Sequence, residues 1–157
     1  MTSPRKGELW LEDDQATTRL GAAVARGLAA GEAVCLWGPL GAGKSTLARG
    51  LIRALTGPHE DVPSPTFTLV QVYDGEVLTV AHFDLYRLSD PDEIHEIGLD
   101  EALETGAAII EWPERLNGRL PANRLDIEIR PGERDGIEGR LARLTPHGSW
   151  EGRTVEV

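Results

Sequence analysis

Residues 38–45, Gly-Pro-Leu-Gly-Ala-Gly-Lys-Ser, have the types and the spacing that suit phosphate binding. They fit the P-loop pattern G-x-x-x-x-G-K-[ST], whose glycines let the backbone wrap closely around a phosphate group. Lys44 adds a positive charge for the β- and γ-phosphates, and the Ser45 hydroxyl can ligate Mg²⁺. The residues expected to contact a nucleotide are Gly38, Pro39, Leu40, Gly41, Ala42, Gly43, Lys44, Ser45 and Thr46.

The use of lysine in this chain supports that interpretation. Of the 16 basic residues only Lys6 and Lys44 are lysine, and the others are arginine. A compact point charge suits a phosphate cradle better than a planar guanidinium does. Because no lysine follows position 44, a guanine-reading Asn-Lys-x-Asp is impossible. We therefore expect adenine nucleotides, ATP and ADP, together with Mg²⁺.

The segments on either side of the loop are those that a P-loop needs. Residues 34–37 form an apolar run typical of a buried strand, and Leu47, Leu51 and Leu55 recur at helical spacing before a stop at residues 57–58. A strand, a glycine turn and a helix in this order aim the free N–H groups of the helix N-terminus at an anion.

A P-loop also requires an acidic residue for the metal at the carboxyl end of a neighbouring strand. Asp84 follows the predicted strand 77–83, and Glu111 follows the predicted strand 107–110. Spacing alone does not choose between them. We expect at least one to serve Mg²⁺, and the other could orient a metal-bound or an attacking water.

A third element is the stretch Thr66-Phe67-Thr68, which follows a proline-rich loop over residues 58–66. Hydroxyl groups at alternate positions could sense a γ-phosphate, as the switch loops of GTPases do. The alternative is that these threonines merely favour a strand.

The remaining pattern predicts a three-layer α/β P-loop NTPase fold, with a mainly parallel sheet and antiparallel additions, in one domain over residues 1–157. Asp13 or Asp14 can cap a helix over residues 15–30, which Gly31 would end. Asp74-Gly75-Glu76 predicts a hairpin. The other expected elements are strands over 66–73, 77–83, 107–110, 125–129 and 140–145, and helices over 91–96 and 99–103.

Composition limits the function further. The chain has 157 residues and a net charge of −10, and no run of Lys and Arg marks a nucleic-acid surface, so a partner should hold any nucleic acid.

Cys35 is the only cysteine of the sequence, which excludes an internal disulfide and a cysteine-rich zinc site. The N-terminus has no apolar leader and no segment is long enough to span a bilayer, so we expect a cytoplasmic protein with no membrane contact.

Four stretches together resemble the bacterial TsaE family, the small ATPase of tRNA threonylcarbamoyladenosine synthesis. They are residues 38–46, residues 64–70 (Ser-Pro-Thr-Phe-Thr-Leu-Val), residues 82–88 (His-Phe-Asp-Leu-Tyr-Arg-Leu) and residues 110–113 (Ile-Glu-Trp-Pro). Their order and spacing match the family over about residues 10–145. The third stretch followed by the fourth is far more specific than the P-loop.

The resemblance implies a role for each matching residue. Lys44 and the loop backbone would hold the phosphates, Ser45 and Glu111 would ligate Mg²⁺, and Asp84 would act on a metal-bound water or in hydrolysis. Thr66 and Thr68 would lie near the γ-phosphate. Five residues would lie beside the nucleotide or close over its base: Trp112, Asp14, Gln15, Thr17 and Arg140.

The resemblance also implies the activity, a Mg-dependent ATPase that is slow by itself and acts on a TsaB–TsaD partner pair, which alone would contact tRNA. One alternative is a small-molecule P-loop kinase, with Arg115, Arg119 and Arg124 as a lid over the transferred phosphate. Another is an adaptor whose partner binding depends on nucleotide without hydrolysis.

Overall fold

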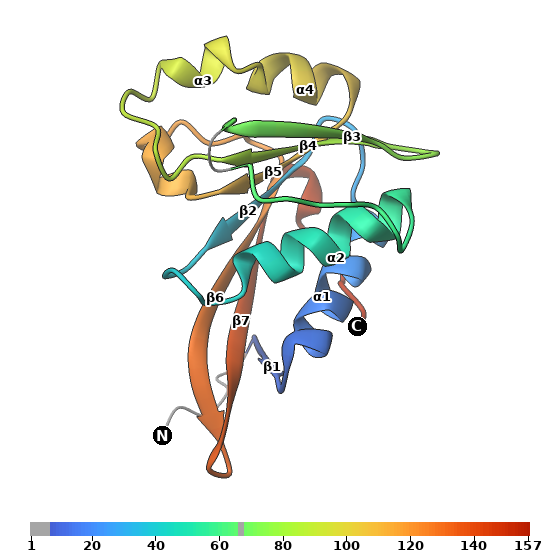
Figure 1. Ribbon diagram of the computed structural model, residues 1–157, viewed down its shortest axis with the longest axis vertical. Coiled ribbons are helices and arrows are strands. Elements are labelled where there is room, and N and C mark those ends of the chain that lie inside the picture. The colour runs from blue at the N-terminus through green and yellow to red at the C-terminus, as the bar shows by residue number, and fades with distance from the viewer. Residues whose placement is uncertain (1–6, 66–67) are drawn as a thin grey trace.

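The computed structural model describes residues 7–65 and 68–157, which fold into a mixed α/β structure around one sheet (Figure 1). Among these residues seven strands are paired in the order β1-β7-β6-β2-β5-β4-β3. The strands are β1 (Glu8–Leu11), β2 (Ala33–Trp37), β3 (Val70–Asp74), β4 (Thr79–Asp84), β5 (Ala107–Glu111), β6 (Arg124–Arg134) and β7 (Ile137–His147). The helices are α1 (Asp14–Gly27), α2 (Lys44–Thr56), α3 (Glu93–Glu96) and α4 (Leu99–Thr105), with 3₁₀ turns η1 (Pro113–Leu116) and η2 (Gly148–Trp150).

The prediction of a mainly parallel sheet holds only for its centre. Strands β6, β2, β5 and β4 are parallel neighbours, whereas the pairings β1–β7, β7–β6 and β4–β3 are antiparallel. The difference comes from the β6–β7 hairpin, whose strands are much longer than the predicted 125–129 and 140–145. Asp135 and Gly136 at its turn both have positive φ, 53° and 77°, as a tight hairpin turn requires.

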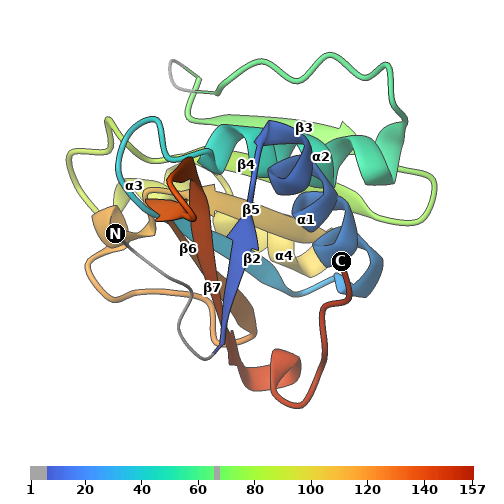
Figure 2. The same cartoon turned by 90° about the horizontal axis from the view of Figure 1, so that it is seen from below.

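The sheet lies between two helical layers, as predicted (Figures 1 and 2). Successive side chains of a strand point to opposite faces. Val34 and Leu36 of β2 therefore join the core beneath α1 and α2, while Ala33 and Cys35 join the core that α3 and α4 cover. Because both faces of β2 are covered, its sequence is apolar throughout, as is usual in parallel sheets.

The start of α1 follows the prediction and its end does not. The Asp13 side chain accepts a hydrogen bond from the Ala16 N–H at 2.8 Å, which caps the helix. The helix ends at Gly27, and Gly31 lies in the following turn rather than ending the helix. Leu28 is already extended and buried, and the Ala29 N–H donates to the Glu32 carboxylate instead of continuing the helix.

The predictions for the helix after the glycine loop and for the hairpin are confirmed. Helix α2 begins at Lys44, directly after the glycine loop, and ends before Gly57. Strands β3 and β4 form the hairpin predicted at Asp74-Gly75-Glu76, with Asp74 opposite Thr79. The strand predicted over 66–73 begins only at Val70, and the part of that prediction on residues 66 and 67 lies outside the described residues.

Parallel pairing brings the carboxyl ends of β2, β4 and β5 to one edge of the sheet, next to the N-terminus of α2. Ligands of open α/β sheets bind in the crevice at such an edge. In the described part of the chain, no helix combines the length and the apolar character needed to cross a membrane.

Candidate functional site

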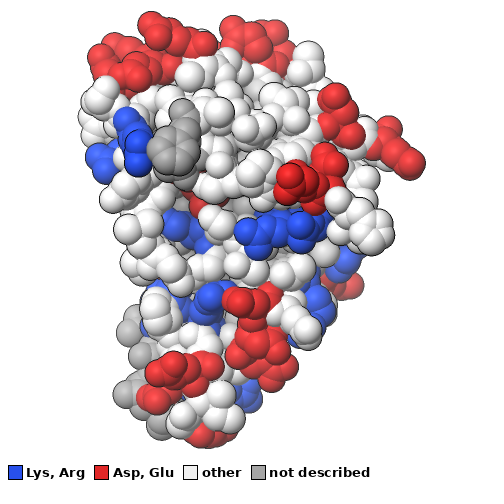
Figure 3. All heavy atoms as spheres, in the orientation of Figure 1, with Lys and Arg blue, Asp and Glu red and all other residues white. Residues whose placement is uncertain are grey.

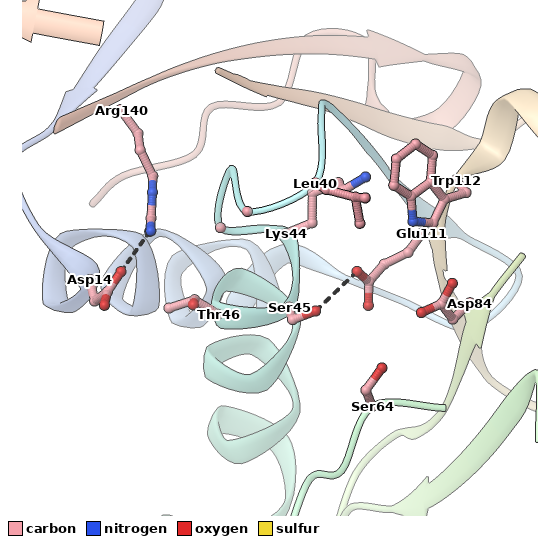
Figure 4. A pocket seen from close by; sticks show the side chains of 12 residues that line it. Asp14, Leu40, Lys44, Ser45, Thr46, Ser64, Asp84, Glu111, Trp112 and Arg140 are labelled. Atoms are coloured by element: carbon pink, nitrogen blue, oxygen red, sulfur yellow. Dashed lines mark hydrogen bonds and ion pairs between the residues drawn. The ribbon is translucent and has the colours of Figure 1, made fainter. Parts of the chain in front are cut away.

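A cavity of about 380 Å³ lies at this edge, where the loop after β2 meets the ends of β4 and β5 (Figure 4). Segments far apart in the sequence contribute to it: the start of α1, the loop, both strand ends and β7. Its lining residues are Asp14, Leu40, Gly41, Gly43, Lys44, Ser45, Thr46, Ser64, Asp84, Glu111, Trp112 and Arg140.

The loop has the open backbone that phosphate binding needs. Gly38 and Gly43 have φ values of 140° and 105°, which favour glycine. A Cβ on Gly43 would lie 2.6 Å from Nη1 of Arg140, so only glycine leaves this approach open. Gly43 is also the N-cap of α2 and supplies no side-chain hydrogen bond to it. Of the loop residues predicted to contact nucleotide, Gly38, Pro39 and Ala42 do not line the cavity, and Ala42 is buried in the core.

Lys44 is a buried cation in the cavity wall. Its side chain is buried, and Nζ donates a hydrogen bond to the Gly38 carbonyl at 2.6 Å. Nζ also lies 3.2 Å from the centroid of the Trp112 ring, a cation–π contact. Burial lowers the pKa of Lys44, and the carboxylates of Glu111, Glu114 and Asp84 oppose that effect. Trp112 itself has a φ of 61°, so the backbone is strained where β5 leaves the sheet.

The two acids predicted at strand ends lie side by side. Asp84 and Glu111 are register partners on β4 and β5, and both are buried at the cavity. Ser45 Oγ donates to Glu111 Oε1 at 3.2 Å (Figure 4). Asp84 Oδ1 accepts a hydrogen bond from the Tyr86 N–H at 3.1 Å. The hydroxyl of the P-loop is therefore in contact with Glu111.

Sequence reasoning missed His82, which lies behind Glu111. Its Nε2 is 2.6 Å from Glu111 Oε2, and both side chains are 3% exposed. Strand periodicity places His82 on the same face of β4 as Asp84, because the two are two residues apart, but it does not show which strand lies beside that face.

Comparison with known proteins identifies the family. The family model described as "Threonylcarbamoyl adenosine biosynthesis protein TsaE" matches residues 11–140. The chain belongs to the TsaE family. It is 43% identical over 117 residues to the tRNA threonylcarbamoyladenosine biosynthesis protein TsaE of Treponema pallidum, covering 74% of this chain and 85% of that protein.

Two further relatives extend the similarity to nearly the whole fold. The protein of the same name from Bacillus subtilis is 38% identical over 139 residues, 88% of this chain and 82% of its own length. The crystal structure of Bacillus subtilis YdiB superposes with a TM-score of 0.73 at 28% identity, over 92% of this chain and 88% of that chain.

Of the five residues predicted beside the nucleotide or over its base, three line the cavity and two do not. Trp112, Asp14 and Arg140 line it, and Arg140 Nη1 forms an ion pair with Asp14 Oδ1 at 2.7 Å. Thr17 is fully buried and does not line the cavity. Its hydroxyl accepts a hydrogen bond at 3.3 Å from Arg140, which does line it. Gln15 is exposed outside the lining.

The proline-rich loop reaches the cavity through a residue that was not predicted. Ser64 lines the cavity, whereas Thr68 lies outside the lining and donates to the Pro65 carbonyl at 3.5 Å. Thr66 lies outside the described residues. The serine belongs to the motif 64–70, so its hydroxyl was a signal available in the sequence.

The residues fit a magnesium ion that also contacts a phosphate. Mg²⁺ usually takes one or two carboxylates, several waters and phosphate oxygens rather than a cage of protein ligands. Ser45 and Glu111 supply a hydroxyl and a carboxylate in contact. Among residues 7–65 and 68–157, no group of three or more His, Cys, Asp and Glu side chains is arranged to hold a metal.

Proposed function

We propose that this protein binds ATP with Mg²⁺ in the cavity and hydrolyses it in support of tRNA threonylcarbamoyladenosine biosynthesis. The observation that carries the proposal is the contact of Ser45 with Glu111 beside the buried Lys44, at the N-terminus of α2. A hydroxyl, a carboxylate and an ammonium group in this arrangement are the parts of a phosphoryl-transfer site.

Each group would have a distinct task. Lys44 would leave the Gly38 carbonyl for the β- and γ-phosphates, which are stronger partners because they carry charge. Ser45 and Glu111 would ligate Mg²⁺, which neutralises charge on the phosphates when bound. Asp84, beside Glu111, would orient the water that attacks the γ-phosphate. Ser64, which lines the cavity, would contact that phosphate in the role predicted for Thr66 and Thr68.

The partner would be a TsaB–TsaD-type pair, with tRNA held by the pair. The net charge of −10 supports a subunit that does not grip nucleic acid. On the face shown in Figure 3, acidic side chains gather over α3 and α4, and the basic ones lie in separate groups across the middle. The proposal places the protein in the cytoplasm, with the tRNA-modifying machinery.

The contacts of the predicted arginine lid weigh against the kinase alternative. Arg119 pairs with Asp92, and Arg124 pairs with Asp126 at 3.1 Å. The Arg115 guanidinium lies 5.8 Å from the Tyr86 ring centroid. None of the three lines the cavity.

The test is phosphate release from ATP, with and without the purified TsaB–TsaD pair. Stimulation by the pair is expected for the wild-type protein and for Glu104→Ala, an exposed control on α4. Glu111→Ala should lose turnover by roughly 100-fold or more, as when an oriented charge is removed from an active site.

Each other outcome points to one alternative. ADP release that depends on an added metabolite would favour the kinase. Nucleotide-dependent binding of the pair without any turnover would favour the adaptor. Turnover that a saturating amount of the pair leaves unchanged, with no complex formed, would exclude the role in this assembly.

A further inference from the structure

We propose that His82 is the positioning residue of Glu111: it fixes the plane of the carboxylate and thereby sets the affinity of the cavity for Mg²⁺. The inference rests on the proposed function, because it concerns the same metal site. The observation that carries it is the contact of His82 Nε2 with Glu111 Oε2 at 2.6 Å, between two side chains that are each 3% exposed.

Glu111 cannot fix its own carboxylate. The last torsion of a glutamate side chain is broad, so the plane of its two oxygens is set by their partners. In this structure the partners divide the oxygens between them, because His82 contacts Oε2 and Ser45 donates to Oε1. His82 thus holds one oxygen on the protein side and leaves the other beside the P-loop hydroxyl.

The position of His82 in the sheet makes it a rigid partner. His82 lies on β4 opposite Ile109 of β5, and two residues further along the same strands Asp84 lies opposite Glu111. Val80 and Ile109, the apolar residues on the same strand faces, are fully buried. The imidazole therefore contacts the carboxylate from the buried face of the sheet, and Glu111 lines the cavity whereas His82 does not.

The second ring nitrogen indicates how the hydrogen bond is made. Nδ1 of His82 is buried without a hydrogen-bond partner among the described residues. A neutral ring that donates from Nε2 leaves only an acceptor lone pair unmatched, which costs less than a buried, unmatched N–H. The structure thus favours an N–H group that donates to the metal-binding carboxylate. Partners of this kind change metal affinity by about 10- to 100-fold.

The experiment compares His82→Gln with His82→Asn. Glutamine carries an amide N–H at a reach similar to that of Nε2, whereas asparagine carries the same group one methylene shorter. The readouts are the affinity for ADP in EDTA and the Mg²⁺ concentration that half-saturates the ADP-bound protein, both by calorimetry. The control is His95→Gln, the same change in an exposed His–carboxylate pair, in which Nδ1 of His95 on α3 lies 3.2 Å from Asp100 on α4.

We expect His82→Asn to raise the half-saturating Mg²⁺ concentration by about 10- to 100-fold, and His82→Gln by only about threefold. ADP affinity in EDTA should change by less than about twofold in all three variants, because the metal partner is then absent. An unchanged Mg²⁺ requirement in His82→Asn would overturn the inference. So would an equal loss of metal-free ADP affinity, which indicates a structural role.

A measurement on the wild-type protein covers the case in which His82→Asn does not fold. The imidazole N–H resonance of His82 should shift when Mg²⁺ is added at saturating ADP, and this shift should be absent in Glu111→Gln. No shift in the wild type would overturn the inference while leaving nucleotide binding intact. Failure of the wild type to bind ADP at all would instead overturn the proposed function, and this inference with it.

Discussion

The wall of the cavity that carries Glu111 and Asp84 is buried, whereas the wall that carries Asp14 and Arg140 is partly open to solvent. The two acids are 2% and 5% exposed at the ends of adjacent parallel strands. Across the cavity, the Asp14 side chain is 73% exposed and that of Arg140 is 24% exposed. Asp14 begins α1, and Arg140 comes from β7, near the other end of the chain.

This difference in exposure indicates which part of the site is preformed. The pairing of β4 with β5 places Asp84 beside Glu111. The Glu111 carboxylate is also contacted by His82. The opposite wall is held by the partly exposed Asp14–Arg140 ion pair and by the hydrogen bond from Arg140 to Thr17. An exposed ion pair is screened by salt and contributes little to stability. We therefore expect the buried wall to perform the chemistry and the exposed wall to open and close around the nucleotide.

The largest expected effect lies on the buried wall. Asp84→Asn should lower ATP turnover by about 100-fold, because an amide orients an attacking water less well than a carboxylate does. The amide oxygen can still accept the Tyr86 N–H, so the fold should persist. The Mg²⁺ requirement should stay near that of the wild type, as measured by titration alongside kcat. Asp100→Asn, exposed on α4, is the control.

If Asp84→Asn weakened Mg²⁺ binding as much as Glu111→Gln does, the two acids would share the metal. The division of tasks within the buried wall would then be wrong.

A smaller effect is expected where the loop meets the exposed wall. Gly43→Ala and Gly41→Ala both place a side chain at positive φ, which costs about 1–2 kcal/mol. A Cβ at Gly43 also meets the Arg140 side chain, whereas a Cβ at Gly41 has no heavy atom within 4 Å among the described residues. Gly43→Ala should therefore lose up to about 1 kcal/mol more unfolding free energy, in urea, because the Asp14 ion pair is lost with it. Equal losses would show that Arg140 does not pack on the loop in solution.

The smallest effect should come from the exposed ion pair itself. A double-mutant cycle with Asp14→Asn and Arg140→Gln should give a coupling below about 1 kcal/mol that falls in 1 M salt. The matched pair is Glu32–Arg153 at 2.6 Å, in which the Glu32 side chain is 5% exposed. Its coupling should be larger, up to about 3 kcal/mol.

The pH dependence of the Glu32–Arg153 pair provides a further check. Burial opposes ionisation of Glu32, but hydrogen bonds from Arg153, Ser149 and the Ala29 N–H outweigh it and lower the pKa of Glu32 from its ordinary value of 4.5. A lowered carboxyl pKa contributes stability above 4.5 that is lost as the pH falls through the folded-state pKa. The Glu32–Arg153 coupling should therefore persist at pH 5 and disappear only in stronger acid. A coupling at Asp14–Arg140 as large and as resistant to salt would contradict the contrast between the walls.

Local patterns accounted for most of the buried wall. The strand, loop and helix around Lys44 were predictable because glycine spacing and apolar periodicity act over a few residues. The same is true of the hairpin at Asp74-Gly75 and of the acids at positions 84 and 111. The Asp135-Gly136 turn carried the same local signal as Asp74-Gly75, so the long β6–β7 hairpin was available to sequence reasoning and was overlooked.

Other features could not be inferred locally. Strand β1 has four residues and exists through its pairing with β7, about 130 positions further along the chain. The contact of His82 with Glu111 depends on which strand lies beside β4, and a residue pattern within β4 does not contain that information. The early end of α1 likewise depends on Glu32 and Arg153, which meet only in the folded chain.

The sequence by itself determined the glycine loop, the types of its chemical groups and the family to which they belong. These depend on residue order over short distances, where steric limits on the backbone and side-chain chemistry suffice. The tertiary structure decided that Glu111 rather than Asp84 contacts Ser45, that His82 stands behind it and that Arg140 closes the far wall. Those outcomes follow from strand order and register, which the whole chain settles when it buries its two cores.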